Sequence, residues 1–238
     1  MVEIEKEVQV KSAERVRDHG EVLTARREVE AMLDLVKNES ERIDSRFLEP
    51  ACGDGNFLVA ILERKLKTVS ARYKGKKVDF EVNLLSALAS IYGIDLLEDN
   101  IKLAIDRMLE IACQSYKNNL KEYPDDDFKK IMRFILKKNI LQGDSLNGID
   151  KIIFTQWSLV GYKFKREEFS FSQLNQQAEI MNTPLFAHLT SDKGEDVFIP
   201  QPIKEYPLTY YRNLGEGVFF YRLRNKHIFT FITCEMCK

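Results

Sequence analysis

Two glycines separated by one residue, Gly53 and Gly55, are followed at longer intervals by the acids Asp95 and Asp144. Each of these sites comes directly after a short apolar segment of the kind that forms a strand. Glycines after a strand let the backbone approach a ligand closely, and a carboxylate after the next strand can accept both hydroxyls of a ribose. Because ligands of open α/β sheets bind outside the carboxyl ends of the strands, these residues predict a nucleoside-binding crevice. An ordinary tight turn at the glycines is the alternative interpretation.

The spacing of the glycines narrows the class of ligand. Dinucleotide-binding turns follow the pattern G-x-G-x-x-G, but the position of the third glycine holds Leu58. No segment has the pattern of a phosphate-binding P-loop. The expected ligand is therefore a nucleoside without a pyrophosphate group, and S-adenosylmethionine is the candidate that fits.

Two segments carry a resemblance to a known family. Residues 47–58 read Phe47-Leu48-Glu49-Pro50-Ala51-Cys52-Gly53-Asp54-Gly55-Asn56-Phe57-Leu58. They resemble motif I of the amino-group DNA methyltransferases, in which an acid or Asn precedes Pro-Ala-Cys-Gly-x-Gly. Upstream, Asp18-His19-Gly20-Glu21-Val22-Leu23-Thr24 resembles the G-x-x-x-T segment, motif X, of N6-adenine methyltransferases of the restriction-modification type. That segment lines the methionine end of the cofactor in the family, and Ala25 stands here where the family has Pro.

Two later segments resemble motifs II and III of the same family, in the same order. They are Tyr92-Gly93-Ile94-Asp95, whose acid holds the cofactor ribose in the family, and Gln142-Gly143-Asp144-Ser145, whose Asp accepts from the adenine amino group. The resemblance covers residues 15 to about 155. It implies that S-adenosyl-L-methionine is bound by Thr24, Glu49, Pro50, Ala51, Gly53, Gly55, Asp95, Leu96 and Asp144.

The catalytic motif of that family is missing. The family has Asn or Asp, then Pro-Pro, then Tyr or Phe after the strand that follows motif III, whereas this chain has Thr155-Gln156-Trp157-Ser158 and no Pro-Pro pair. In the family the amide accepts from the target amino group and the ring stacks on the flipped base. Gln156 and Trp157 are the candidates for these two roles. The alternative is that both residues merely end a strand.

The elements that position these residues follow from apolar periodicity. Strand-like segments alternate with helical patterns over residues 46–154, which predicts a doubly wound, mostly parallel α/β sheet of the Rossmann-like methyltransferase type. Ile152-Ile153-Phe154 is expected to be a further strand of that sheet. The expected organisation is a polar segment (1–20), a cofactor-binding domain (21–173) and a C-terminal extension (174–238). The extension is expected to end in a hairpin of residues 218–223 and 228–233.

Composition excludes several other classes. The chain has 238 residues, 44% of them hydrophobic, and a net charge of −1, so neither charge-driven disorder nor a strongly basic surface is indicated. The first ten residues have no apolar core of a signal peptide and no run is long enough to span a membrane, so a reduced cytoplasmic protein is expected. We expect no metal, because Cys234 and Cys237 have no second ligand pair nearby and the acids 125–127 suit a helix start.

The partners expected are DNA and a second polypeptide. Basic and aromatic residues are interleaved in residues 151–166 and 203–238, where they could contact phosphates and stack on bases, or form a partly buried face with solvated charges. The leading hypothesis is a DNA adenine-N6 methyltransferase. A non-catalytic or degenerate subunit acting beside an active partner is the second, favoured by the missing motif. A methyltransferase of RNA or small molecules is the third, and the Pro-Ala-Cys-Gly sequence argues against it.

Overall fold

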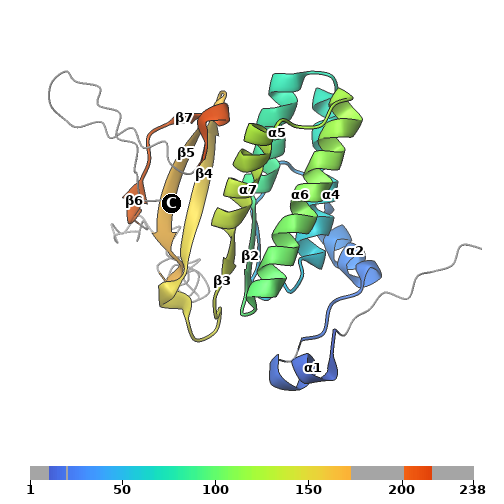
Figure 1. The fold of residues 1–238 in the computed structure, drawn as a ribbon, viewed down its shortest axis with the longest axis vertical. Helices are drawn as coiled ribbons and strands as arrows, with labels where there is room; N and C mark the ends of the chain where they lie inside the picture. The colour runs from blue at the N-terminus through green and yellow to red at the C-terminus, as the bar shows by residue number, and fades with distance from the viewer. Residues whose placement is uncertain (1–10, 20, 173–200, 216–238) are drawn as a thin grey trace, which may run out of the picture.

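The computed structural model describes residues 11–19, 21–172 and 201–215. These residues form an α/β structure with one parallel sheet, one antiparallel sheet and a set of packed helices (Figure 1). Within the described residues, no helix is both long and apolar enough to cross a bilayer. The predicted hairpin of residues 218–233 and the Cys234–Cys237 pair lie outside them.

The parallel sheet has three strands in the order β1-β2-β3: β1 (Phe47–Glu49), β2 (Ile91–Asp95) and β3 (Ile140–Gln142). The central strand β2 pairs with Glu49 of β1 and Ile140 of β3 through the same residue, Gly93. All three strands point the same way, so their carboxyl ends meet at one edge. The predicted alternation of strands and helices over residues 46–142 is confirmed.

The helices arise where apolar residues recur at helical spacing. The longer ones are α2 (Arg26–Leu35), α4 (Asn56–Tyr73), α5 (Lys77–Ala89), α6 (Glu98–Leu120) and α7 (Asp126–Asn139), and the short ones are α1 (Ala13–His19) and α3 (Lys37–Ser40). At the start of α7 the side chain of Asp125 accepts a hydrogen bond from Phe128 N at 2.8 Å. The acids before Phe128 therefore cap a helix, as predicted.

The second sheet corrects the prediction that residues 152–154 add a strand to the parallel sheet. There the chain forms β4 (Ile153–Val160), which pairs antiparallel with β5 (Lys163–Ser170), and the short strands β6 (Lys204–Glu205) and β7 (Thr209–Tyr210) pair with β5. Between β4 and β5 lie only two residues, and the first of them, Gly161, has a φ of +60°. This connection makes a tight hairpin. A parallel pair would require a crossover of a dozen or more residues.

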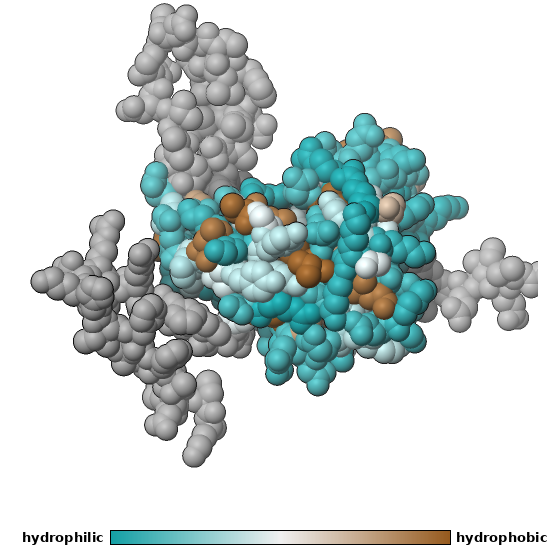
Figure 2. Space-filling view, turned by 90° about the horizontal axis from the view of Figure 1, so that it is seen from above, coloured by the Kyte–Doolittle hydropathy of each residue, from teal (hydrophilic) through white to brown (hydrophobic). Residues whose placement is uncertain are grey.

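The antiparallel sheet lies beside α5 and α7, away from α4 and α6 (Figure 1). Trp157 of β4 donates from Nε1 to Asn139 Oδ1 at 2.8 Å, and Asn139 in turn donates to the carbonyl of Ile91 at 3.1 Å. Tyr92 of β2 donates its hydroxyl to the carbonyl of Thr155 at 2.9 Å. These buried bonds join the two sheets. The outer surface seen from above is mainly hydrophilic, with small separate apolar patches (Figure 2).

Residues 201–215 are anchored to the same core by a buried carboxylate. Glu81 on α5 is 1% exposed and accepts hydrogen bonds from the hydroxyls of Tyr116 (2.7 Å) and Tyr211 (2.8 Å). Arg212 donates to Glu81 from Nε at 3.0 Å and pairs with Asp125 at 2.7 Å. Burial, together with the carboxylate of Glu81, raises the pKa of both tyrosines. The described part of the predicted extension therefore shares the core of the α/β unit.

We expect Arg212→Met to lower the free energy of unfolding by on the order of 3 kcal/mol, because it leaves the buried Glu81 carboxylate without its cation. Lys130→Met is a matched control, since it removes an exposed pair with Asp127 at 2.9 Å, and such pairs contribute about 1 kcal/mol or less. Urea unfolding followed by circular dichroism measures both variants. Equal, small losses would show that the Glu81–Arg212 pair does not hold the segment.

Candidate functional site

Backbone hydrogen bonds fix the turn between β1 and α4, which is called the glycine turn below. The N–H of Cys52 donates to the carbonyl of Ile94 on β2 at 2.8 Å, and the N–H of Gly55 donates to the carbonyl of Cys52 at 2.9 Å. Gly53 and Gly55 have φ values of +53° and +92°, a region that side chains other than glycine rarely adopt. The sequence thus places its two glycines where the backbone reverses direction outside the carboxyl end of β1.

Asp95, at the end of β2, is bonded to the turns that follow β1 and β3. Its Oδ2 accepts from the N–H of Gly53 at 2.9 Å, and its backbone carbonyl accepts from the N–H of Gly143, after β3, at 2.9 Å. Its Oδ1 accepts from Leu97 N at 2.9 Å and from Asn100 Nδ2 at 3.1 Å. The predicted convergence of the glycine turn with the acid of β2 is therefore present.

The hydrogen bonds of Asp95 leave it one acceptor position. A carboxylate oxygen has two lone pairs, and Oδ1 uses both of its own on Leu97 and Asn100. Oδ2 uses one on Gly53 and keeps the other. One hydroxyl of a ribose can bind there without displacing a present partner, whereas binding of both hydroxyls, as the sequence predicts, requires a bond to Oδ1 to be exchanged.

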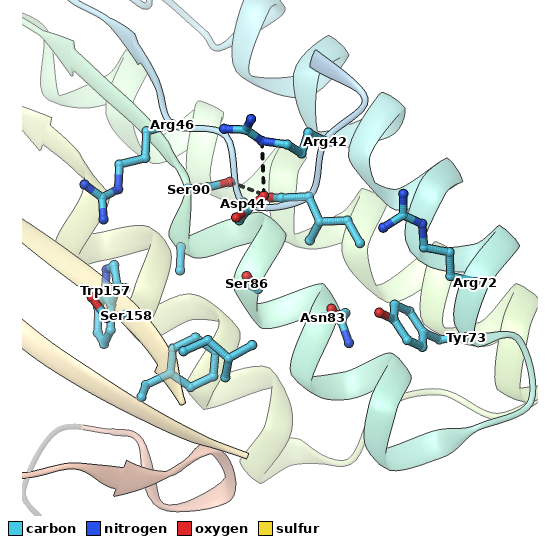
Figure 3. Close-up of a pocket in the computed structure, with 14 residues that line it drawn as sticks. Arg42, Asp44, Arg46, Arg72, Tyr73, Asn83, Ser86, Ser90, Trp157 and Ser158 are labelled. Atoms are coloured by element: carbon cyan, nitrogen blue, oxygen red, sulfur yellow. Dashed lines mark hydrogen bonds and ion pairs between the residues drawn. The ribbon is translucent and has the colours of Figure 1, made fainter. Parts of the chain in front are cut away.

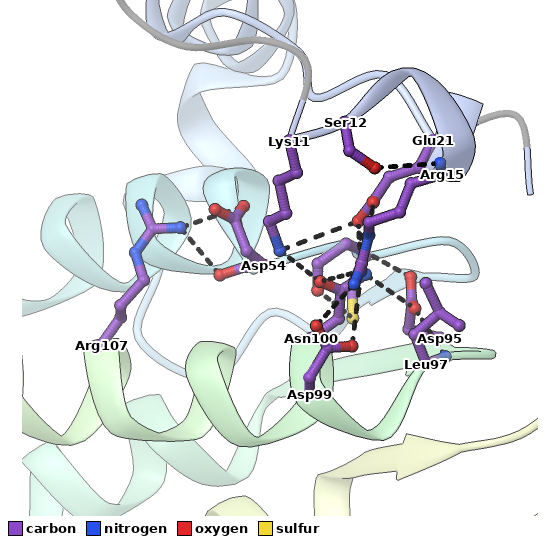
Figure 4. A network of polar contacts seen from close by, with 12 residues as sticks. Lys11, Ser12, Arg15, Glu21, Asp54, Asp95, Leu97, Asp99, Asn100 and Arg107 are labelled. Carbon is purple, nitrogen blue, oxygen red and sulfur yellow. Dashed lines mark hydrogen bonds and ion pairs between the residues drawn. The ribbon is translucent and has the colours of Figure 1, made fainter.

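A polar network connects Asp95 to the segment before α2 (Figure 4). Asn100, 1% exposed, donates from Nδ2 to Glu21 Oε1 at 2.7 Å as well as to Asp95. Its Oδ1 accepts from Arg15 at 3.1 Å and from Lys11. A hydrogen bond from Arg15 lowers the pKa of Glu21, which keeps that acid ionised at neutral pH. Two cations and two carboxylates thus surround one buried amide beside the glycine turn.

The other side of the turn is clamped by α6. Arg107 donates from Nη1 to the carbonyl of Asp54 at 2.8 Å and lies 3.1 Å from its Oδ1, and from Nη2 to Asn56 Oδ1 at 2.9 Å (Figure 4). Asn56 in turn donates from Nδ2 to the carbonyl of Thr24 at 3.0 Å. The segment that resembles motif X therefore lies against the glycine turn, and Thr24 is brought there through its backbone.

The two glycines have different roles in packing. A Cβ on Gly55 would lie 2.9 Å from the Cβ and 3.2 Å from the Cα of Ala104, so the close approach of α4 to α6 requires glycine. A Cβ on Gly53 would meet only the end of the Leu23 side chain, at 3.1 Å. Gly55 thus permits helix packing, and Gly53 is the glycine that borders the accessible side of the turn.

The remaining residues of the resemblance to motifs I and II flank the turn. Pro50, Ala51 and Leu96 are exposed, Leu96 by 53%. Glu49 accepts from the N–H of Ala51 at 3.3 Å, and burial raises the pKa of its carboxyl group above the ordinary value. Leu96 therefore offers an apolar surface directly after Asp95.

Asp144 organises its own turn after β3. Its Oδ1 accepts from the N–H groups of Asn147 (2.9 Å) and Leu146 (2.8 Å), and its Oδ2 accepts from Asn147 Nδ2 at 3.2 Å. These bonds hold the pKa of Asp144 below its ordinary value. Asp144 is thus an ionised acceptor at the same sheet edge as Asp95, and part of its capacity is already used.

The two catalytic candidates are not brought to the glycine turn. Gln156 lies at the amino end of β1, where its Oε1 is 3.4 Å from Arg46 Nη1, whereas the glycine turn leaves the carboxyl end. Trp157 is 6% exposed, donates to Asn139 and packs edge-to-face on Phe134 with ring centroids 6.1 Å apart. Trp157 is therefore a buried residue of the antiparallel sheet that lies away from the glycine turn.

Sequence reasoning missed Asn100 and Arg107, which fix the turn from α6. A signal for Asn100 was present, because it precedes Ala104 and Met108 at intervals of four on the buried face of α6. A buried amide on an apolar stripe requires hydrogen-bond partners. Among the described residues no group of three or more His, Cys, Asp or Glu is placed to hold a metal ion.

We expect Gly55→Ala to cost roughly 2–5 kcal/mol of stability, because it adds overpacking against α6 to the strain of a positive φ. Gly53→Ala should cost about 1–2 kcal/mol, for the strain alone. Gly161→Ala is the matched control, since its φ is +60° and no atom lies within 4 Å of the added Cβ. Thermal and urea unfolding measure all three. A loss at Gly55 no larger than that at Gly161 would contradict the packing role.

Comparison of the chain with protein-family models, with curated proteins and with solved structures finds no match. A function for the chain is therefore inferred from its own residues. Asp95 lies at the centre of the candidate site, with the glycine turn on one side and the turn after β3 on the other.

Proposed function

We propose that this chain binds S-adenosyl-L-methionine at the glycine turn and belongs functionally with the DNA adenine-N6 methyltransferases, on a doubly wound, Rossmann-like sheet. One observation carries the proposal: the carboxylate of Asp95 is hydrogen-bonded to Gly53 N, and its backbone to Gly143 N. Nucleoside-binding α/β proteins place a glycine turn and an acid that binds the ribose at one edge of the sheet. In this chain the glycine turn, Asp95 and a further acid, Asp144, lie at one such edge.

The residues of the turn fit the chemical groups of such a ligand. Asp95 retains one acceptor position, which suits a ribose hydroxyl, and Leu96 offers apolar surface for an adenine ring. Asp144 is an ionised acceptor for the adenine amino group. Thr24 lies across the turn, bonded through Asn56, where the methionine end would lie. Glu49 and Gly53 belong to the same turn, next to Asp95.

The cofactor would supply an activated methyl group on a positively charged sulfur. The chain's own contribution is to orient that group and to place an acceptor for the proton-bearing amino group of the target base. A flipped base also requires an aromatic surface and hydrogen-bond acceptors, and extrusion from the duplex costs a few kcal/mol. Within the described residues, the pair predicted for these tasks, Gln156 and Trp157, lies away from the turn.

This position of Trp157 favours a second candidate function. A domain that binds the cofactor but presents no stacking residue would act as a non-catalytic or incomplete subunit. A partner polypeptide would then supply the base-binding or recognition elements. The two candidates share the cofactor site and differ in whether the chain alone transfers a methyl group to DNA.

We expect the intact chain to bind S-adenosyl-L-methionine in a calorimetric titration. Asp95→Asn should weaken binding roughly ten- to hundredfold, because a hydrogen bond to a charged acceptor contributes about 1.5–3 kcal/mol. Asp99→Asn is the matched control: its acid pairs with Arg15 at 2.6 Å in the same network, and its side chain is 60% exposed. Absence of binding by the intact, folded chain would refute the proposal.

We expect the purified chain to methylate DNA weakly or not at all on its own, since the base-binding motif is missing and Trp157 is buried. Incorporation of tritiated methyl groups into DNA measures this, with the chain alone and with the products of neighbouring genes. Rapid, sequence-specific methylation by the single chain would refute the expectation. In that event Gln156→Ala and Trp157→Ala would identify whether these residues form the base site.

A further inference from the structure

A cavity of about 440 Å³ lies at the opposite end of β1 from the glycine turn (Figure 3). Its walls are the segment 42–46 that leads into β1, the last residues of α4, one face of α5, and residues 157–159 of β4. This volume is within the range of pockets that hold small molecules. None of the residues in the proposed cofactor site lines it.

Positive charge dominates the rim of the cavity. Arg42, Arg46 and Arg72 line it, against one acid, Asp44. Arg42 is neutralised in place, because its Nε lies 3.3 Å from Asp44 Oδ1 and its Nη2 lies 3.2 Å from Glu39. Two guanidinium groups, those of Arg46 and Arg72, therefore retain an uncompensated charge.

The two uncompensated arginines have few bonds of their own. Arg46 makes one long hydrogen bond of 3.4 Å, to Gln156. Arg72 makes no hydrogen bond or ion pair with any residue that the structure describes. In Figure 3 the two side chains come from opposite sides of the cavity. A guanidinium group without a protein partner retains five donors in a planar fork that matches phosphate oxygens.

The floor of the cavity is a polar stripe on an otherwise buried helix. Asn83, Ser86 and Ser90 follow one another at intervals of three and four on or just after α5, between residues that are buried and apolar (Figure 3). Across the described part of the chain, the hydroxyls of Ser86, Tyr73 and Ser158 have no hydrogen-bond partner. Three free hydroxyl donors thus line the same cavity as the arginines.

A buried lysine lies behind this floor. Lys65 on α4 is fully buried, and its Nζ donates to Ser90 Oγ at 2.7 Å, to the carbonyl of Ile43 at 3.1 Å and to the carbonyl of Ser45. None of these three partners carries a negative charge. Burial lowers the pKa of Lys65 to about 7. At neutral pH much of the Lys65 population is therefore uncharged, so the positive charge that faces the cavity comes from Arg46 and Arg72.

From this arrangement we infer that the cavity is a binding site for a small phosphate-bearing molecule of nucleotide size. Arg46 and Arg72 hold the phosphate oxygens from two sides, and the hydroxyls of Tyr73, Ser86 and Ser158 donate from the floor and wall. Charge-assisted hydrogen bonds of this kind are the strongest that a protein offers to an anion. The site is independent of the proposed cofactor site, because the two share no residue; Trp157, which forms part of its wall, lies away from the glycine turn.

Calorimetric titration of the full chain with pyrophosphate and with ADP, at low ionic strength, tests the inference. Binding of ADP should be roughly ten- to hundredfold weaker in Arg72→Gln and in Arg46→Gln, because each loses charged hydrogen bonds. Arg72 has no partner in the described protein, so its replacement leaves the fold intact. Arg27→Gln is the matched control: its side chain is 92% exposed, and its ion pair within the described residues is with Glu28, at 4.0 Å.

The probes also distinguish the source of the phosphate. Tighter binding of ADP than of pyrophosphate supports a nucleotide, and equal binding of both supports recognition of the phosphate groups alone. Three results would overturn the inference: no binding of either probe, equal binding by the wild type and both arginine variants, or binding of a short DNA duplex only. The last result would assign these arginines to a nucleic-acid backbone.

Discussion

One residue, Asp95, connects the segments that follow the three parallel strands. It fixes the glycine turn after β1 through Gly53, starts α6 through Leu97, and connects through Asn100 to Glu21. Its backbone carbonyl fixes the turn after β3 through Gly143. A group with so many protein partners is rigid, so a ligand meets a preorganised acceptor and pays little ordering entropy. Because Asp95 both bonds the protein and offers the acceptor to a ligand, a substitution there changes the stability of the fold as well as the affinity for the ligand.

The folded arrangement also divides the molecule into two unlike ends. Beyond the carboxyl ends of the parallel strands lie acids, some of them paired with cations: Glu21, which pairs with Lys11 and Arg15, and Asp95 and Asp144. Toward the amino end of β1 lie Arg46 and Arg72, with Lys65 buried beside them. Because the two sites lie at opposite ends of β1, a cofactor with a positively charged sulfur and an anion can bind to the chain without competing.

Much of the fold was predictable from local patterns. Apolar residues at helical spacing predict the helices over residues 56–139. Short apolar runs before a glycine or an acid predict β1, β2 and β3. The strand at Ile152–Phe154 was assigned to the wrong sheet, because a continuous apolar run has the same appearance in parallel and antiparallel sheets. This strand pairs with β5 because Gly161, in the two-residue connection between β4 and β5, lets the chain reverse direction.

The candidate site was predictable in part, for a related reason. The roles of Gly53 and Asp95 follow from their residue types and from their positions directly after a strand, so the sequence pattern predicts both. Asn100 and Arg107 act through partners 79 and 53 residues away, in Glu21 and Asp54, and no local pattern predicts such pairs. Gly55 shows a further limit: a glycine that admits a neighbouring helix has the same appearance in the sequence as one that admits a ligand.

The bond between Glu81 and Arg212 has a consequence for the order of events during synthesis. The two residues are 131 positions apart, and Glu81 lies on a helix whose other face is already apolar core. At translation rates of 5–20 residues per second, roughly 7–26 seconds separate their emergence from the ribosome. Throughout that interval the carboxylate has no cation and must remain hydrated, which delays close packing of α5 against α6 and α7. Close packing of this core is therefore completed only after the segment that contains Arg212 has been synthesised.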